Sequence, residues 1–258
     1  KYTIDNIMDI VESLSTTNVS IVGETIIDEY IYGDCLGKSS KYPSLVFNQK
    51  EKKRFLGGVL AVAHRLSPLV RSVNVLTYLG SQDFPEALEL VIDSLSPNIS
   101  LDYFIKEDSP TITKTRFVDS YWKSRLFETY DINDRPLSLE ENGVFQYKMK
   151  ILKNILAIDY GHGMFSGNEE VFAVNVQANS GNRGYNFVSK YQGRASVFTV
   201  DNAELRLETR DKHSSSRLLA CQLHRRLGKE STLVVTLGAN GCLIVTPTEV
   251  IEVPAVSG

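Results

Sequence analysis

The chain has 258 residues, of which 42% are hydrophobic and 23% are charged, so it can bury one large core or two modest ones. Its formal net charge is −3. No overall positive field therefore exists to hold a polyanion, and we expect no nucleic-acid partner. A small phosphorylated ligand would need only a local cluster of basic groups.

The sequence carries no membrane or disulfide signature. No apolar run approaches the ~18 residues needed to cross a bilayer, and the first residues lack the apolar core of a signal peptide. The three cysteines are scattered and form no CxxC pair, which favours free thiols over a disulfide framework or a zinc site. We therefore predict a cytoplasmic protein with no membrane association.

The predicted elements begin with a helix over Ile4–Leu14, whose apolar residues share one face, and a buried strand over Val19–Val22 that runs into a glycine. Such an order opens many parallel α/β sheets. The stretches 30–55 and 111–130 instead alternate polar and apolar residues, which predicts antiparallel strands paired away from the main sheet. We interpret these two stretches as a small β lid.

Repeated βα units fill the rest of the chain. Helices are expected over 57–70 and 217–227, and near-continuous apolar strands over 72–80, 155–161, 171–177, 195–201, 232–238 and 241–247. Such strands are typical of a parallel sheet with helices on both faces. We therefore predict an α/β fold in one domain over 1–258, with a doubly covered, mostly parallel sheet and the β lid.

One spacing does not fit this pattern. Only about ten residues separate the strands expected at 155–161 and 171–177, whereas a parallel crossover usually takes a dozen or more residues including a helix. We hypothesise that a helix-bearing segment is missing between roughly Gly167 and Val171.

Several candidate ligand residues follow the strands, at the edge where open α/β sheets bind ligands. Asp28 either accepts hydrogen bonds from two vicinal sugar hydroxyls or is a turn acid. Gly57 and Gly58, before a helix, either let the backbone approach a ligand or form a plain tight turn. Asp159 is a candidate to bind substrate or to order the shell of a magnesium ion, whereas the neighbouring His162 is more typical of a polar loop than of a general base.

Two basic residues form a second candidate group. Lys114 and Arg116 lie two apart on an expected strand, so they share one face. They either converge on an anion, most simply a sugar phosphate, or protect a solvated edge strand.

A third group follows the later strands. Asp201 and Glu204 are three apart, a spacing that suits either a hydrated magnesium ion with its phosphates or a helix cap. Thr236, Gly238 and Gly241 either contact a nucleotide phosphate or form an Asn-Gly hairpin.

The order of these motifs is more specific than any one of them. The stretches GETIIDEYIYGD, FLGGVLAVA, PTITKTR, ILAIDYGHG, DNAE and VTLGANG resemble those of the ribokinase-like (PfkB) carbohydrate kinases, most closely the heptose-phosphate kinase domain of ADP-heptose synthases. The resemblance covers nearly the whole chain. It implies transfer of the ATP γ-phosphoryl group, with Mg²⁺, to a hydroxyl of a sugar or sugar phosphate in nucleotide-sugar and surface-polysaccharide biosynthesis.

The resemblance also implies roles for the candidates. The sugar would contact Asp28, Gly57 and Gly58, and the sugar's own phosphate would contact Lys114 and Arg116. The nucleotide and a magnesium ion held through water would lie at Asp201, Glu204, Thr236 and Gly238. A homodimer through the lid is expected, and in some relatives a fused nucleotidyltransferase domain.

The sequence departs from the family pattern at several positions. Glu24 replaces the usual Asp of the first strand-turn, Ala61 the Asn of GGxxN, Asp201 the Asn of N-x-x-E, and His162 the Lys often found after DYG. These changes leave open a non-catalytic sugar- or nucleotide-binding module that retains the kinase fold. A dinucleotide-dependent oxidoreductase is excluded, because no GxGxxG follows the first strand.

The last departure concerns catalysis. The family's GAGD motif supplies a helix N-terminus for the transferred phosphoryl group and an aspartate base, and this chain ends at VPAVSG, where the approach to that motif begins. We assign no catalytic residue within 1–258 and expect the catalytic aspartate beyond Gly258. Because losing a base typically costs about 10²–10⁴-fold, these 258 residues alone should be nearly inactive.

Overall fold

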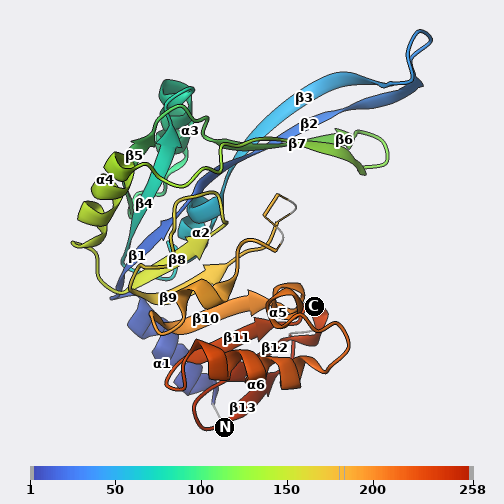
Figure 1. Ribbon diagram of the computed structural model, residues 1–258. Coiled ribbons are helices and arrows are strands. Elements are labelled where there is room, and N and C mark those ends of the chain that lie inside the picture. Colours follow the sequence, from blue (N-terminus) through green and yellow to red (C-terminus); the bar gives the residue numbers. More distant parts are fainter. Residues whose placement is uncertain (1–2, 180, 183, 256–258) are drawn as a thin grey trace.

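The computed structural model describes residues 3–179, 181–182 and 184–255, which form two sheets and the helices that pack on them. The main sheet has nine strands in the order β13-β12-β11-β10-β9-β8-β1-β4-β5, and the lid has four in the order β3-β2-β6-β7. Figure 1 shows the long β2–β3 hairpin rising away from the main sheet.

The strands alternate with helices along most of the chain. The main-sheet strands are β1 (Asn18–Gly23), β4 (Ser72–Gly80), β5 (Ile99–Lys106), β8 (Ile155–Asp159), β9 (Val171–Val176), β10 (Ala195–Asp201), β11 (Thr232–Thr236), β12 (Cys242–Val245) and β13 (Val250–Val253). The lid strands are β2 (Thr25–Lys38), β3 (Leu45–Gly57), β6 (Ile112–Asp119) and β7 (Arg125–Asp131). The helices are α1 (Ile4–Leu14), α2 (Gly58–Leu66), α3 (Phe84–Ser94), α4 (Leu139–Met149), α5 (Asn202–Thr209) and α6 (Ser216–Leu227), with short 3₁₀ turns η1 (Val188–Tyr191) and η2 (Gly238–Asn240).

Strand directions confirm the predicted α/β fold. Every neighbouring pair from β5 across to β11 is parallel, and β12 runs antiparallel to both of its neighbours. The lid differs from expectation in two ways. It begins at Thr25, because only Glu24 separates β1 from β2, and its two central strands, β2 and β6, pair in parallel rather than antiparallel.

Helices pack on both faces of the main sheet, as predicted. One core cluster contains apolar residues of α2 and α3, and the other contains those of α4, α5 and α6. Beyond β8, the buried apolar residues of α5 and α6 pack against the second face. On the opposite face a half-buried row of side chains crosses the strands at Ala173, Val197, Val234 and Ile244.

The link from β8 to β9 is short for a connection between parallel strands. The two strands are parallel neighbours, and residues 160–170 join them continuously without a helix. The backbone N–H groups of Ser166 (3.2 Å) and Gly167 (2.8 Å) donate to the buried Glu169 carboxylate, which holds this link in a compact turn. The chain therefore closes this link without a helix, and a missing helix-bearing segment between Gly167 and Val171 stays a hypothesis.

Helix α1 forms where predicted, with Thr3 as its N-cap, but its apolar face is exposed. Ile4 is 78% exposed, and Ile7 and Met8 are about half exposed. No described helix is long and apolar enough to cross a membrane.

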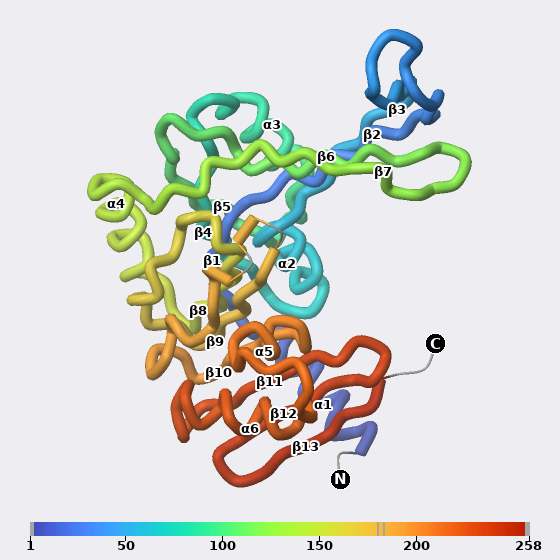
Figure 2. Tube along the Cα trace, turned by 45° about the vertical axis from the view of Figure 1, so that its right-hand side comes forward, coloured from blue at the N-terminus to red at the C-terminus, as the bar shows by residue number. Residues whose placement is uncertain are grey.

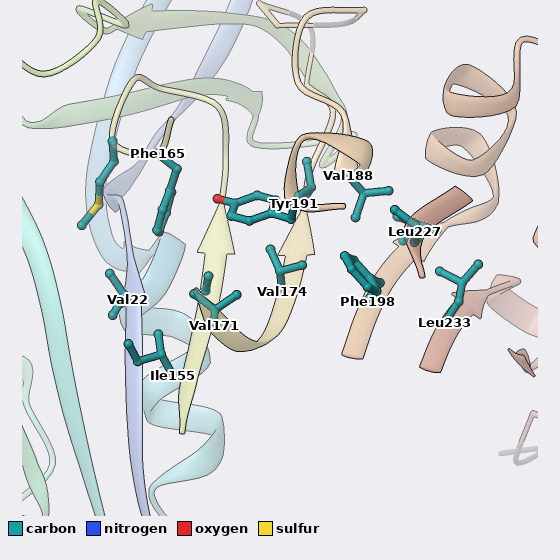
Figure 3. Packing of buried hydrophobic residues seen from close by; sticks show 14 of the residues in the cluster. Val22, Ile155, Phe165, Val171, Val174, Val188, Tyr191, Phe198, Leu227 and Leu233 are labelled. Carbon is teal, nitrogen blue, oxygen red and sulfur yellow. The ribbon is translucent and has the colours of Figure 1, made fainter. Parts of the chain in front are cut away.

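The larger core cluster generates a stability prediction. Figure 3 shows Phe198 of β10 packed among Val174 of β9, Leu233 of β11 and Leu227 of α6, and Phe198 is fully buried. Phe198→Ala should lower the free energy of unfolding by about 3–5 kcal/mol, measured by urea denaturation. Phe172→Ala, at a half-exposed position on β9, should cost much less. Equal losses in the two variants would contradict this description of the core.

Candidate functional site

The junction of the lid and the main sheet brings together most of the predicted sugar-side residues. Asp28 on β2 lies directly across from Lys114 on β6, and Tyr30 lies across from Arg116. Gly57 ends the neighbouring strand β3, and a Cβ atom there would overlap Asp28 Oδ2. A side chain at this position would therefore displace the Asp28 carboxylate.

Gly58 adopts a backbone conformation that favours glycine. Its φ is +59°, in the left-handed region, and a Cβ atom would overlap the carbonyl oxygen of Glu24. That oxygen accepts a hydrogen bond from Val59 N (3.0 Å). The glycine pair therefore sets the close approach of α2 to the end of β1, as the sequence interpretation allowed.

Arg116 is paired with carboxylates. Its Nη1 donates to Asp28 Oδ1, its Nε lies 3.5 Å from Glu128 Oε1, and its guanidinium lies 5.3 Å from the centre of the Tyr30 ring. Arg116 therefore already has its countercharge. Lys114 and Arg116 share one face, as predicted, but among the described residues only Arg116 is ion-paired with a carboxylate.

Lys114, unlike Arg116, lies next to two aromatic rings rather than in an ion pair. Its side chain is only 8% exposed, and its ammonium nitrogen lies 5.4 Å from the Tyr130 ring centre and 6.0 Å from that of Tyr160. Within the described part of the chain no carboxylate forms an ion pair with it. Burial lowers the pKa of Lys114 from 10.5, and nearby Asp28 partly offsets this effect.

Glu24 connects three elements beneath this cation. Its Oε2 accepts a hydrogen bond from Tyr160 N (3.0 Å) and its Oε1 accepts one from His162 N (3.1 Å). The side chain is fully buried. Burial, reinforced by the charge of Asp159, raises the pKa of Glu24 to about 7. The backbone of the 160–162 turn is thus fixed by a residue of the β1–β2 junction.

Lys106 contacts the same turn, of which His162 is the last residue. Lys106 Nζ donates to Asn133 O (2.6 Å) and His162 O (3.1 Å), and burial lowers its pKa to about 8. Burial also lowers the pKa of His162 to about 3, helped by the charges of Lys114 and Lys106. His162 is therefore neutral near pH 7 and a weak base, which supports the interpretation that it is not a catalytic base.

Asp159 is engaged within the fold. It is fully buried, and its four acceptor positions are filled: Oδ1 by Gly161 N and Asn186 Nδ2, and Oδ2 by the Tyr191 hydroxyl and Lys190 Nζ. Its carboxylate anchors the segment after β9 to the end of β8. The geometry does not support the predicted substrate contact.

The predicted nucleotide-side residues meet at the carboxyl ends of β10 and β11. Asp201 lies across from Thr236, and it forms a reciprocal capping box with Glu204 at the start of α5. Both oxygens of Glu204 accept backbone hydrogen bonds, from Asp201 N (2.7 Å) and Ala178 N (2.9 Å). Of the two carboxylates, exposed Asp201 is therefore the one whose oxygen can order a hydrated cation.

The end of β11 leads into a hairpin. Gly238 and Gly241 bound the η2 turn, both with positive φ, and β12 returns antiparallel to β11. The helix cap and the hairpin, each weighed as an alternative, are thus formed. The described residues contain no cluster of three or more metal-ligating side chains, so the magnesium and nucleotide roles stay predictions.

The segment that follows β9 joins the two halves of the site. Ala178 N bonds Glu204 on the nucleotide side, while Asn179 Nδ2 donates to Tyr160 O (3.0 Å) on the sugar side. Figure 2 shows β8 and β9 running between β1 and β10, so this segment lies at the middle of the ligand edge. Sequence reasoning missed this role.

Three other site residues were missed. Tyr130 faces Lys114 across the β6–β7 pair, which counting back from the lid turn could have suggested. Tyr160 follows Asp159 directly, in the DYG motif. Lys106 ends an edge strand, and nothing in its local pattern distinguishes it from a solvated lysine.

The lowered pKa of His162 predicts acid sensitivity. A histidine held neutral in the folded state contributes stability that is full above pH 6.5 and is lost as pH falls toward 3, at most about 1.4 kcal/mol for each pH unit. His162→Gln should remove this part of the acid slope, measured by urea denaturation from pH 7 to pH 4. His213→Gln, at an exposed histidine, should leave the slope unchanged. An identical slope in wild type and His162→Gln would contradict the prediction.

Comparison with known proteins agrees with this geometry. Residues 16–257 match the model of the pfkB family carbohydrate kinases. Bifunctional protein HldE of Helicobacter hepaticus is 25% identical over 259 residues, covering 93% of this chain and 53% of that protein. HldE of Koribacter versatilis is 26% identical over 258 residues, covering 93% and 52%. The chain thus spans about half the length of these relatives.

Solved structures share the fold. Phosphofructokinase-2 from Escherichia coli in complex with fructose-6-phosphate superposes with a TM-score of 0.69 at 13% identity, covering 93% of this chain and 80% of that one. Ribokinase from Thermotoga maritima gives 0.61 at 14% identity, covering 93% and 78%. With a ribokinase-like fold and a family match over nearly its whole length, the chain belongs to the pfkB family of carbohydrate kinases.

Proposed function

We propose that this protein is an ATP-dependent, Mg²⁺-requiring kinase that phosphorylates a hydroxyl of a sugar already carrying a phosphate. Membership of the pfkB family supports transfer to a sugar. The HldE relatives favour a heptose phosphate, and so an activity in the cytoplasm that leads to nucleotide sugars for surface polysaccharides.

The state of Lys114 carries the proposal. A buried ammonium group with no carboxylate partner is costly, and its two neighbouring tyrosine rings offset only part of that cost. An anionic group on the substrate would supply the missing countercharge. Asp28, directly across from Lys114, would accept hydrogen bonds from the sugar hydroxyls. A phosphorylated sugar fits this pair better than a neutral one.

The second half of the site would hold the nucleotide. Asp201 and Thr236 lie on neighbouring parallel strands, at the same sheet edge as the sugar side. When bound, Mg²⁺ would neutralise charge on the ATP phosphates, and Asp201 would orient one of its waters. The part of the described residues is to hold the two substrates in line.

Assembly is a further part of the proposal. The lid exposes large aromatic side chains, among them Tyr42, Tyr121 and Trp122, and a second lid would bury them in a homodimer. The HldE relatives are named bifunctional and are about twice as long as the matched region. We therefore propose a fused nucleotidyltransferase domain in the whole protein.

Binding measurements test the sugar side directly. Titration calorimetry should show tighter binding of heptose 7-phosphate or fructose 6-phosphate than of the same sugars without phosphate. Lys114→Met should weaken binding of the phosphorylated sugar about 10–100-fold, because a charge-assisted contact is lost. Lys50→Met, at an exposed lid position, should have no effect. Equal binding of phosphorylated and free sugars would overturn the anion assignment.

Turnover measurements test the reaction. The full-length protein should form ADP from ATP and Mg²⁺ only when a sugar phosphate is present. Tight binding of the sugar phosphate with no ADP formation would instead favour a non-catalytic binding module, to which the departures at Glu24, Ala61 and Asp201 also point.

A further inference from the structure

Glu24 is unusual among the acidic residues of the site. It is fully buried, yet no lysine or arginine in the described ranges forms an ion pair with it. Its two carboxylate oxygens are instead shared between the backbone N–H groups of Tyr160 and His162. Its carbonyl oxygen accepts from Val59 N at the start of α2.

The segment that Glu24 holds carries part of the Lys114 site. The Tyr160 ring lies 6.0 Å from the Lys114 ammonium group. The His162 carbonyl oxygen accepts hydrogen bonds from Lys106 Nζ (3.1 Å) and the Tyr78 hydroxyl (3.3 Å). A shift of the 160–162 backbone would therefore move one wall of the Lys114 site and loosen the contacts below it.

Stability alone does not account for this residue. A carboxylate whose folded-state pKa is raised contributes stability below its unfolded value of 4.5, and this contribution is lost as pH rises through about 7. The ionised side chain is thus a cost near neutral pH. The groups that interact electrostatically with it are Asp159 on β8, Lys106 on β5, Lys114 on β6, Tyr78 on β4, and Tyr160 and Tyr191.

We propose that Glu24 is a positioning residue for the sugar half of the site: its carboxylate fixes the Tyr160–His162 turn so that the Tyr160 ring stands against Lys114, while its carbonyl oxygen fixes the diglycine start of α2. This inference rests on the proposed function only in taking Lys114 as the anion contact. The link itself is a feature of the backbone and can be tested without turnover.

Two substitutions separate position from charge. Glu24→Gln keeps the shape but points an NH₂ group at a backbone N–H, so one of the two hydrogen bonds is lost and the negative charge disappears. Glu24→Asp keeps the charge but is one methylene too short to reach both N–H groups. If Glu24 positions the turn, both variants should weaken binding of heptose 7-phosphate about 3–10-fold. This is the loss of affinity expected when one cation–π contact is displaced.

Hydrogen exchange reports the link itself. At pH 8, where wild-type Glu24 is mostly ionised, the amides of Tyr160 and His162 should exchange about 3–10-fold faster in both variants, as expected for one lost hydrogen bond. Glu169→Gln is the matched control, because Glu169 is also buried and also accepts two backbone N–H groups, those of Ser166 and Gly167. It should speed exchange at 166–167 and leave the binding of heptose 7-phosphate unchanged.

The pH dependence of stability adds a readout that packing alone would not move. The loss of unfolding free energy attributed to Glu24 between pH 4.5 and pH 7 should be absent in Glu24→Gln. Tighter binding in Glu24→Gln with unchanged binding in Glu24→Asp would show that Glu24 acts only through its charge, and would overturn the proposal. Unchanged exchange at Tyr160 and His162 would overturn it as well.

The outcomes also separate this inference from the proposed function. If Lys114→Met binds heptose 7-phosphate as wild type does, the anion assignment fails, and so does the proposed role of Glu24 in binding. Exchange at 160–162 would then still decide whether Glu24 holds the turn.

Discussion

The position of the site depends on the passage from β1 to β2, which takes a single residue. Gly23 ends β1 where a Cβ atom would meet the carbonyl oxygen of Ile158 at 2.5 Å, so the neighbouring strands can close around this point only with glycine. Thr25 then starts the lid inside the core, its hydroxyl 2.8 Å from that of Thr77. Because the lid strand is anchored here, the register that places Asp28 beside Lys114 is fixed relative to the main sheet.

Two buried lysines show how surroundings decide what a cation can do. Lys106 is fully buried, and backbone carbonyl oxygens of Asn133 and His162 accept its hydrogen bonds. Its charge is therefore used within the fold. Lys114 is nearly as buried, but its neighbours are the faces of Tyr130 and Tyr160, which attract a cation weakly and leave its N–H groups available. The same residue type thus acts as a structural group in one place and as a candidate ligand group in the other.

The sequence was enough to predict which residues share one face of a strand, but not which residues of other strands lie beside them. Period-two alternation put Lys114 and Arg116 on one face of a lid strand, and the structure confirms it. The pairing of Arg116 with Asp28 depends on the parallel register of β2 and β6, strands separated by five other elements, and no local pattern encodes that register. For Asp201 and Glu204 the spacing was informative because a capping box is local. Ordinary crossover lengths did not anticipate the link from β8 to β9, because its turn depends on the buried Glu169 carboxylate.

Asp28 and Asp159 show why an acid at the end of a strand is an ambiguous signal. Both follow apolar strands near one sheet edge, and both were candidates for substrate contact. Asp159 ends an interior strand, and the segment after β9 folds over it, so three donors from that segment and the N–H of Gly161 fill its oxygens. Asp28 lies on a lid strand that has left the main sheet, where it forms an ion pair with Arg116, which itself also lies near Glu128. A carboxylate can exchange partners with a diffusing sugar only where some acceptor capacity stays open to solvent. That condition is set by which segment covers the strand end, and so by tertiary packing rather than by the motif.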